Sequence, residues 1–239
     1  LITCMKKMLR GLLTGVRLFF EPLLFPPYCL IGDHFLENGE ILVCHQCLSG
    51  LPSTSENHRP FGWEDTDTAL DGVFSYWEFS DEFRSLIHQL KYHHKPVLGI
   101  IMGKYVAAQL PTGWMGEECR LVPIPLHKTK LRERGYNQAE YIARGIAKRT
   151  NIPVQSDLLY RKKYTRTQTT LSRSQRTDNM SDAFVLHRKK IAGRNNTAYL
   201  LVDDIFTTGS TLESAASALR SHGGAPVFGV TLGTVPLSM

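Results

Sequence analysis

Apolar residues recur along the chain with two spacings, one typical of strands and one typical of helices. Runs with strand character occupy residues 73–79, 120–126, 198–205 and 226–235. Apolar positions repeat at helical spacing through residues 81–94, 96–110, 136–150 and 211–222. The last strand, helix and strand follow one another closely, which predicts a parallel pair joined by a right-handed crossover. The sequence therefore predicts an α/β protein whose open, mostly parallel sheet is flanked by helices.

The pattern changes before residue 73 and divides the chain into three predicted parts. Residues 1–52 combine an N-terminal helix with a cysteine-rich module, residues 53–72 form a polar connector, and residues 73–239 form the α/β domain. Within the first part, residues 6–20 are predicted to form an amphipathic helix. Charges and a proline interrupt this apolar N-terminus, so we expect neither a signal peptide nor stable membrane insertion.

Two adjacent acids, Asp203 and Asp204, end the buried run 198–205. Ligands of open parallel sheets bind beyond the carboxyl ends of the strands, which is where this pair is predicted to lie. Adjacent like charges repel, and neither carboxylate is easily buried alone. The pair is therefore interpreted as a site shared with water, a metal ion or vicinal hydroxyl groups.

A turn of small hydroxyl residues follows the acids and leads into the predicted helix 211–222. It consists of Thr207, Thr208, Gly209, Ser210 and Thr211. Backbone N–H groups and hydroxyl donors at a helix N-terminus suit a phosphate, and Gly209 allows close approach of the backbone. Acids for ribose hydroxyls, followed by a cradle for the 5′-phosphate, indicate a ribose phosphate ligand. The alternative is an acidic strand end, capped by Ser and Thr, that holds no ligand.

Residues 200–211 are similar, without a gap, to the phosphoribosyl diphosphate (PRPP) binding motif of type I phosphoribosyltransferases. Four segments together resemble the ComF family: LIHQLKY at 86–92, the segment 121–147 with its RGYNQ, the segment 164–184, and LLVDDIFTTGSTL at 200–212. This resemblance runs from about residue 73 to the C-terminus. It implies a type I phosphoribosyltransferase-like fold with a small zinc-binding N-terminal module, PRPP as ligand with Mg²⁺ bridging its oxygens, and a cytoplasmic protein associated with uptake of transforming DNA.

The resemblance also assigns roles to two basic regions. The loop after the first core strand, with Pro125 and Leu126, would receive pyrophosphate, and Arg132 and Arg134 would supply charge. Asn137 and Gln138 are interpreted as residues that hold this loop. The basic stretch 161–176 resembles a flexible loop that closes over PRPP. Its candidate residues are Lys163, Thr165, Arg166, Gln168 and Arg176. In both regions, solvated basic side chains without a ligand are the alternative.

Charge and cysteine content change this picture only slightly. The formal net charge of +6 is compatible with nucleic acid, a phosphorylated ligand or an acidic partner, and it does not choose among them. Basic residues in 161–176 could also follow the backbone of single-stranded DNA, with a competence helicase-type protein as a further partner. Five cysteines are an odd number with uneven spacing, which argues against a disulfide framework and favours a reducing cytoplasm.

Three of the cysteines have the spacing of a structural zinc site. Cys44 and Cys47 form a C-x-x-C pair, and Cys29 lies 15 residues before it. In the family a second C-x-x-C comes first, but here Gly32 stands where its second cysteine is expected, either by substitution or after a one-residue deletion. We predict His34 as the fourth zinc ligand, with His45 as a weaker candidate. A module that has lost its metal is the alternative.

Three functions follow from these observations. The first is a PRPP-binding, ComF-like phosphoribosyltransferase that displaces pyrophosphate in favour of an unknown acceptor. The second is a non-enzymatic competence factor that binds single-stranded DNA and has a regulatory PRPP site. An ordinary nucleobase phosphoribosyltransferase is disfavoured, because the cysteine module and the RGYNQ segment are foreign to that class. We identify neither a general base nor an aromatic substrate hood.

Overall fold

The computed structural model describes residues 28–37, 39–54, 68–115, 118–162, 183–187, 197–221, 223 and 225–235. Internal contacts divide the chain into two units, Leu1–Gly50 and Leu51–Met239. The helix predicted at residues 6–20 lies outside the described residues. Among the helices that are described, none has the length and apolar character needed to cross a membrane.

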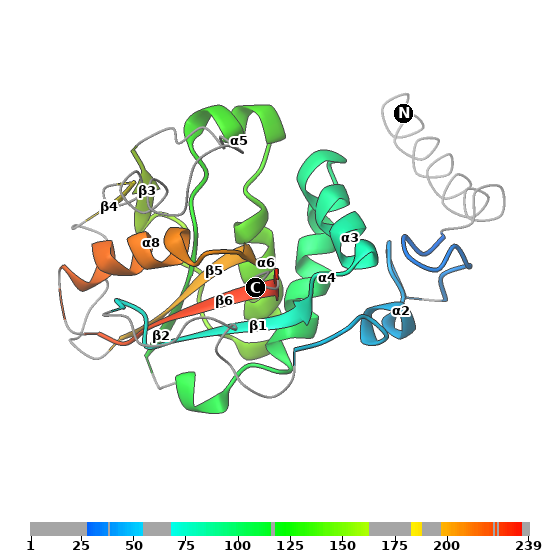
Figure 1. Cartoon of the computed structure of the whole chain (residues 1–239), viewed down its shortest axis with the longest axis horizontal. Helices are drawn as coiled ribbons and strands as arrows, with labels where there is room; N and C mark the ends of the chain where they lie inside the picture. Colours follow the sequence, from blue (N-terminus) through cyan, green and yellow to red (C-terminus); the bar gives the residue numbers. More distant parts are fainter. Residues whose placement is uncertain are drawn as a thin grey trace, which may run out of the picture. The chain divides into compact units, whose positions relative to one another are not determined.

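The larger unit is built on a four-stranded sheet in which every neighbouring pair is parallel. The strands are β1 (Gly72–Glu78), β2 (Cys119–Pro123), β5 (Ala198–Phe206) and β6 (Val227–Thr234), in the order β1-β6-β5-β2. Figure 1 shows β6 between β5 and β1, as this order requires. The predicted open parallel sheet with flanking helices is therefore confirmed.

Helices fill the connections between the strands. They are α3 (Asp81–Tyr92), α4 (Pro96–Ala107), the short 3₁₀ helix η1 (Thr112–Trp114), α5 (Lys128–Arg134), α6 (Gln138–Thr150) and α8 (Ser210–Arg220). A two-stranded antiparallel ribbon pairs β3 (Leu159–Arg161) with β4 (Phe184–Leu186), and α2 (His45–Ser49) belongs to the N-terminal unit. The four predicted helices are present. Helices α2 and α5 and the ribbon were not predicted, because elements of three to seven residues are too short to show a period.

Different elements pack against the two faces of the sheet. Strand β5 alternates its side chains between the faces, as every strand does. Leu201 belongs to a buried cluster with Leu212 and Ala215 of α8 and with residues of β3 and β4. On the other face, α6 contacts β5 and β2 and packs against α4. The site at the end of β5 is thus bordered by α8 and the ribbon on one side, and by α6 on the other.

Helices α4 and α6 cross at glycines. A Cβ atom at Gly103 would lie 2.3 Å from the backbone oxygen of Ile142, and one at Gly145 would lie 2.3 Å from the backbone oxygen of Ile100. These clashes are with backbone, which cannot rotate away as a side chain can. The two helices therefore approach closely only because both positions lack a side chain.

We predict that Gly103→Ala destabilises the fold by about 2 kcal/mol. Alanine gains about 1 kcal/mol of helix propensity. Overpacking costs about 1–3 kcal/mol or more, and contact with backbone places this case at the upper end. Urea denaturation measures the difference. Gly113→Ala is the matched control, because no atom lies within 4 Å of a Cβ there. Equal stability of the two variants would contradict the close crossing.

Candidate functional site

The candidate site forms where the carboxyl ends of β2 and β5 lie side by side. Pro123 pairs with Val202, and the next residue of the chain, Ile124, donates its N–H to the Val202 carbonyl at 2.9 Å. The loop that begins with Pro125 and Leu126, both partly buried, therefore starts beside the acids of β5. The parallel register brings two segments together that are far apart in sequence.

Asp203 and Asp204 are not an equivalent pair. Successive side chains of a strand point to opposite faces, so the two carboxyl groups diverge. Asp203 is on the face of Leu201, towards α8 and the ribbon, whereas Asp204 is on the face covered by α6. Asp204 is 5% exposed and Asp203 is partly buried. One contact joins them: Asp203 Oδ1 accepts the backbone N–H of Asp204 at 2.9 Å.

Asp204 is held by an ion pair and a hydrogen bond. The ammonium nitrogen of Lys91, in the last turn of α3, lies 2.9 Å from Asp204 Oδ2. The Gln138 side-chain amide, at the start of α6, donates to the same oxygen at 3.0 Å. Sequence reasoning missed Lys91, although the LIHQLKY segment contains it, because a lysine in the last turn of a helix ordinarily only complements the helix dipole.

The RGYNQ segment forms the turn from α5 to α6 and connects three elements. Arg134 donates to the Gln138 side-chain oxygen, and Tyr136 donates its hydroxyl to the carbonyl of Leu90 in α3. Asn137 donates to the carbonyl of Ile124 after β2 at 3.0 Å. Gly135, at φ 82°, ends α5 in the left-handed conformation that suits glycine. The turn therefore fixes the loop after β2.

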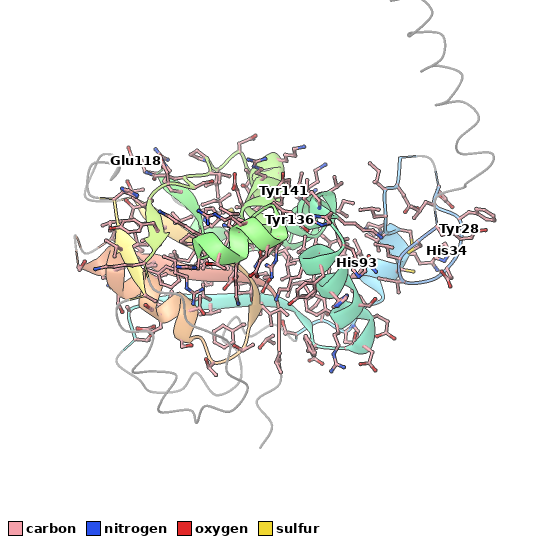
Figure 2. All side chains as sticks on the ribbon, turned by 90° about the horizontal axis from the view of Figure 1, so that it is seen from above. Tyr28, His34, His93, Glu118, Tyr136 and Tyr141 are labelled. Atoms are coloured by element: carbon pink, nitrogen blue, oxygen red, sulfur yellow. The ribbon has the colours of Figure 1, made fainter. Side chains whose placement is uncertain are left out.

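Aromatic rings support the same turn. The Tyr136 and Tyr141 rings lie edge to face with their centroids 5.5 Å apart (Figure 2). The Arg134 guanidinium carbon lies 5.6 Å from the centroid of the Tyr92 ring, at the end of α3. A cation placed over a ring face is attracted by its quadrupole. Arg134 is thus oriented by both a ring and an amide.

Cations surround the acids from several elements. Burial lowers the pKa of Lys130 in α5, and the nearby charges of Arg161, Arg134 and Lys91 lower it further. Burial also lowers the pKa of Arg161 on β3, and the charge of Asp203 opposes this effect. Of the predicted loop cations, Arg134 joins this group, while Arg132 is exposed. Lys163, Thr165, Arg166, Gln168 and Arg176 lie outside the described residues.

Asp203 has a strongly perturbed carboxyl group. Burial raises its pKa to about 7, and the charge of Asp204 adds to the rise. The Asp204 N–H and the charges of Lys91 and Arg161 oppose it. A carboxyl with this pKa gains from any cation or hydrogen-bond donor that enters beside it.

The hydroxyl turn leads directly into α8. Gly209 is buried and has a φ of 74°, a backbone conformation that favours glycine. The Thr208 and Ser210 hydroxyl oxygens lie 2.9 Å apart, and Thr207 is exposed. The first N–H groups of a helix have no partner within the helix, so this end suits an anion.

Glu213 in the first turn of α8 anchors the helix instead of facing a ligand. It accepts the Thr68 hydroxyl at 2.7 Å and the Ala69 backbone N–H at 2.6 Å. Both partners precede β1. These bonds satisfy the carboxylate and tie the first turn of α8 to the segment before β1.

A second cluster lies in the N-terminal unit. Cys29, His34, Cys44 and Cys47 each offer a ligand atom, and these atoms all lie within 4.8 Å of one another. His34 Nε2 lies 3.2 Å from Cys44 Sγ, and Cys29 Sγ lies 3.8 Å from the same sulfur. Figure 2 shows the His34 side chain on this unit. The four predicted ligands are therefore grouped and could bind a metal ion, whereas the alternative ligand His45 is not in the group.

The absence of a side chain at Gly32 makes room for His34. A Cβ atom at position 32 would lie 2.5 Å from His34 Nδ1 and 2.9 Å from Cys47 Sγ. A cysteine at position 32 and the present position of the imidazole therefore exclude each other. Burial and the neighbouring Cys44 and Cys29 sulfurs raise the pKa of Cys47 to about 12. This thiol therefore keeps its proton unless a metal ion beside it stabilises the thiolate.

The known proteins to which this chain is similar have related names. DNA utilization protein YhgH of Escherichia coli K12 is 29% identical over 198 residues, which cover 77% of this chain and 81% of that protein. Competence protein F of Haemophilus influenzae is 36% identical over 43% of this chain and 44% of its own length. Competence protein ComFC of Bacillus subtilis is 33% identical over 43% and 39%, respectively. No model of a protein family matches the chain.

These relatives define a class of competence and DNA-utilization proteins. The chain is similar to these proteins, among them the competence protein ComFC.

Solved structures match the fold only in part. A hypoxanthine phosphoribosyltransferase from Staphylococcus aureus has a TM-score of 0.36 and 19% identity, over 56% of this chain and 61% of its own. Glutamine PRPP amidotransferase from B. subtilis has a TM-score of 0.38 and 17% identity, over 60% and 30%. The chain thus spans less than two thirds of either enzyme. The fold class rests on the parallel sheet and the helices described above.

We predict that Asp203→Asn stabilises the protein at pH 8 and has a smaller effect at pH 5. Because the folded-state pKa of this acid is raised to about 7, its burial costs stability as pH rises from about 4 to 7. Asparagine removes that cost. Urea denaturation at the two pH values measures the change. Asp81→Asn, at a side chain that is 90% exposed, is the control. A pH-independent effect of Asp203→Asn would show that this carboxyl is not perturbed.

We predict that Gly32→Ala lowers metal affinity by about tenfold or more, the range seen for groups that orient metal ligands. The new methyl group would displace the imidazole of His34. Titration with Co²⁺, followed by its absorption bands, measures the affinity. His34→Ala should have a similar or larger effect, while His45→Ala should resemble the wild type. Equal loss in the two histidine variants would contradict the ligand set.

Proposed function

We propose that this chain binds PRPP with Mg²⁺ at the carboxyl edge of the sheet and transfers the phosphoribosyl group to an acceptor. The observation that carries the proposal is the arrangement at the end of β5. The last residues of β5 are two acids followed by Ile205 and Phe206, and a hydroxyl turn then starts an 11-residue helix, with Gly209 in the left-handed conformation. An acidic strand end that could accept ribose hydroxyls, followed by a helix start that suits an anion, supports a ribose phosphate as the ligand.

Each part of the edge has a role that suits part of PRPP. The hydroxyl turn, from Thr207 to Thr211, takes the 5′-phosphate through N–H and hydroxyl donors. The acidic end of β5 takes the ribose hydroxyls. The loop after β2, with Pro125 and Leu126, and the cations around it take the pyrophosphate, with Arg134 oriented towards the site by the RGYNQ turn.

The proposed reaction is a displacement at ribose C1. A bond forms between C1 and the acceptor atom, the bond from C1 to the pyrophosphate oxygen breaks, and the proton of the acceptor passes to solvent. Positive charge develops on the ribose ring and negative charge on the leaving pyrophosphate. Fixed cations such as Lys130, Arg134 and Arg161 stabilise that negative charge without reorganisation. Mg²⁺ bound with PRPP beside Asp203 would share this role by offsetting charge on the phosphate oxygens.

A second function is favoured by the names of the relatives. DNA utilization protein and competence protein describe a link to DNA in those proteins. In this alternative, the chain is a non-enzymatic factor that binds single-stranded DNA through the basic segment 161–176, works with a helicase-type partner, and uses PRPP as a regulator. For both functions we propose a cytoplasmic protein, because an odd number of cysteines argues against a disulfide framework.

We further propose that the cluster of Cys29, His34, Cys44 and Cys47 holds a structural zinc ion. Three sulfurs and one imidazole nitrogen are the donors that zinc prefers, and four protein ligands close the coordination shell. A closed shell leaves no position for substrate. The ion would stabilise a short unit in which Val43 and Leu48 are the buried apolar side chains, besides cysteines, among residues 28–37 and 39–50.

We predict that Thr208→Val weakens PRPP binding by about tenfold, because a hydrogen bond to a charged group is worth about 1.5–3 kcal/mol. Isothermal titration with PRPP and Mg²⁺ measures affinity, and released pyrophosphate measures turnover. Thr112→Val, at an exposed threonine before β2, is the matched control.

Two outcomes would overturn the proposal. If the wild-type chain shows no PRPP binding, the site is wrong. If it binds PRPP but releases no pyrophosphate with any nucleobase or single-stranded DNA, and binds that DNA tightly with strong salt dependence, the non-enzymatic alternative is correct.

A further inference from the structure

The environment of Asp204 is that of a satisfied internal anion. Its side chain is 8% exposed and that of Lys91 is 22% exposed, and the charged atoms lie 2.9 Å apart. The Gln138 amide reaches the same carboxylate oxygen at 3.0 Å. A ligand that took this carboxylate would leave an ammonium group largely buried without its counter-ion, which is strongly unfavourable.

Asp203 is in a different position relative to the hydroxyl turn. It shares the sheet face of Leu201, which packs with Leu212 and Ala215 of α8, so it is on the same side as the helix that begins at the turn. Asp204 is on the opposite face, with α6. A ribose whose 5′-phosphate rests on the start of α8 therefore meets Asp203 first.

The partners of Asp204 close a ring of contacts that is independent of any ligand. From Asp204, the ring passes through Lys91 to the last turn of α3. Leu90 of that turn accepts the Tyr136 hydroxyl, and Tyr92 lies under the Arg134 guanidinium. Arg134 donates to Gln138, which returns to Asp204. The ring joins the ends of α3 and β5 to the turn before α6.

We propose that Lys91 is a positioning residue that holds Asp204 as an internal counter-ion, so that Asp203 is the single acid that contacts the ribose hydroxyls or their Mg²⁺. This inference rests on the proposed PRPP site and divides the two acids by role. Lys91 neutralises a carboxylate that would otherwise repel the phosphates of the ligand. It also holds Arg134 in place through the ring of contacts.

The inference is tested with the full-length chain by a double-mutant cycle on PRPP affinity, measured by isothermal titration with and without Mg²⁺. Lys91→Met alone should weaken binding by about tenfold, because it leaves the Asp204 charge unpaired. Lys91→Met combined with Asp204→Asn should return to within about threefold of wild type, because the pair is then neutral and Gln138 retains its acceptor. Lys91→Arg should also retain affinity. Lys104→Met, at an exposed lysine in the last turn of α4, is the matched control.

Asp203→Asn should weaken PRPP binding by about tenfold or more, and should abolish most of the Mg²⁺ dependence, even in the background of the double variant. The thermal midpoint of each variant identifies any that do not fold, and the neutral double variant keeps the test informative if Lys91→Met is unstable. If the double variant loses as much affinity as Asp203→Asn, then Lys91 or Asp204 contacts the ligand and the inference is wrong. If the wild-type chain binds no PRPP, the proposed function is wrong, and this inference, which rests on it, is wrong as well.

Discussion

The ion pair between Lys91 and Asp204 is the interaction on which the candidate site depends. A carboxylate on a side chain that is 8% exposed needs partners, and this one takes them from α3 and from α6. Those partners then fix the turn that carries Arg134 and the loop after β2. A single desolvated charge therefore sets the relative positions of three segments that surround the end of the sheet. Removing it would alter the geometry of the site as well as its electrostatics.

The backbone constraint behind this arrangement is the pleat of β5. Adjacent residues of a strand point to opposite faces, so a pair of neighbouring acids cannot act as one chelating group. Asp204 forms an ion pair with Lys91 on the face covered by α6. Asp203 lies on the face of α8, and its pKa is raised to about 7. On the face of Asp204, Gln138 at the start of α6 reaches the carboxylate, and α6 itself packs closely against α4 at glycines.

Much of the fold could be predicted from the sequence, because the spacing of apolar residues in a long segment indicates whether it is a helix or a strand and which face is buried. The parallel sheet, α3, α4, α6 and α8 were predicted for that reason, and so were the three cysteines with His34 as a group. Helix α5 and the β3–β4 ribbon were not, since three to seven residues carry no usable period. Lys91 and Arg161 were missed as neighbours of the acids. Their roles depend on long-range contacts, which no local pattern encodes. The opposite directions of Asp203 and Asp204 could have been predicted from strand alternation alone.

A crystal structure of the chain with PRPP and Mg²⁺ is the most direct measurement of the central claim. The account predicts the 5′-phosphate at the start of α8, the ribose hydroxyls or the Mg²⁺ at Asp203, and the Lys91–Asp204 ion pair intact. A ligand bound elsewhere, or a ribose held by Asp204 with Lys91 displaced, would contradict it.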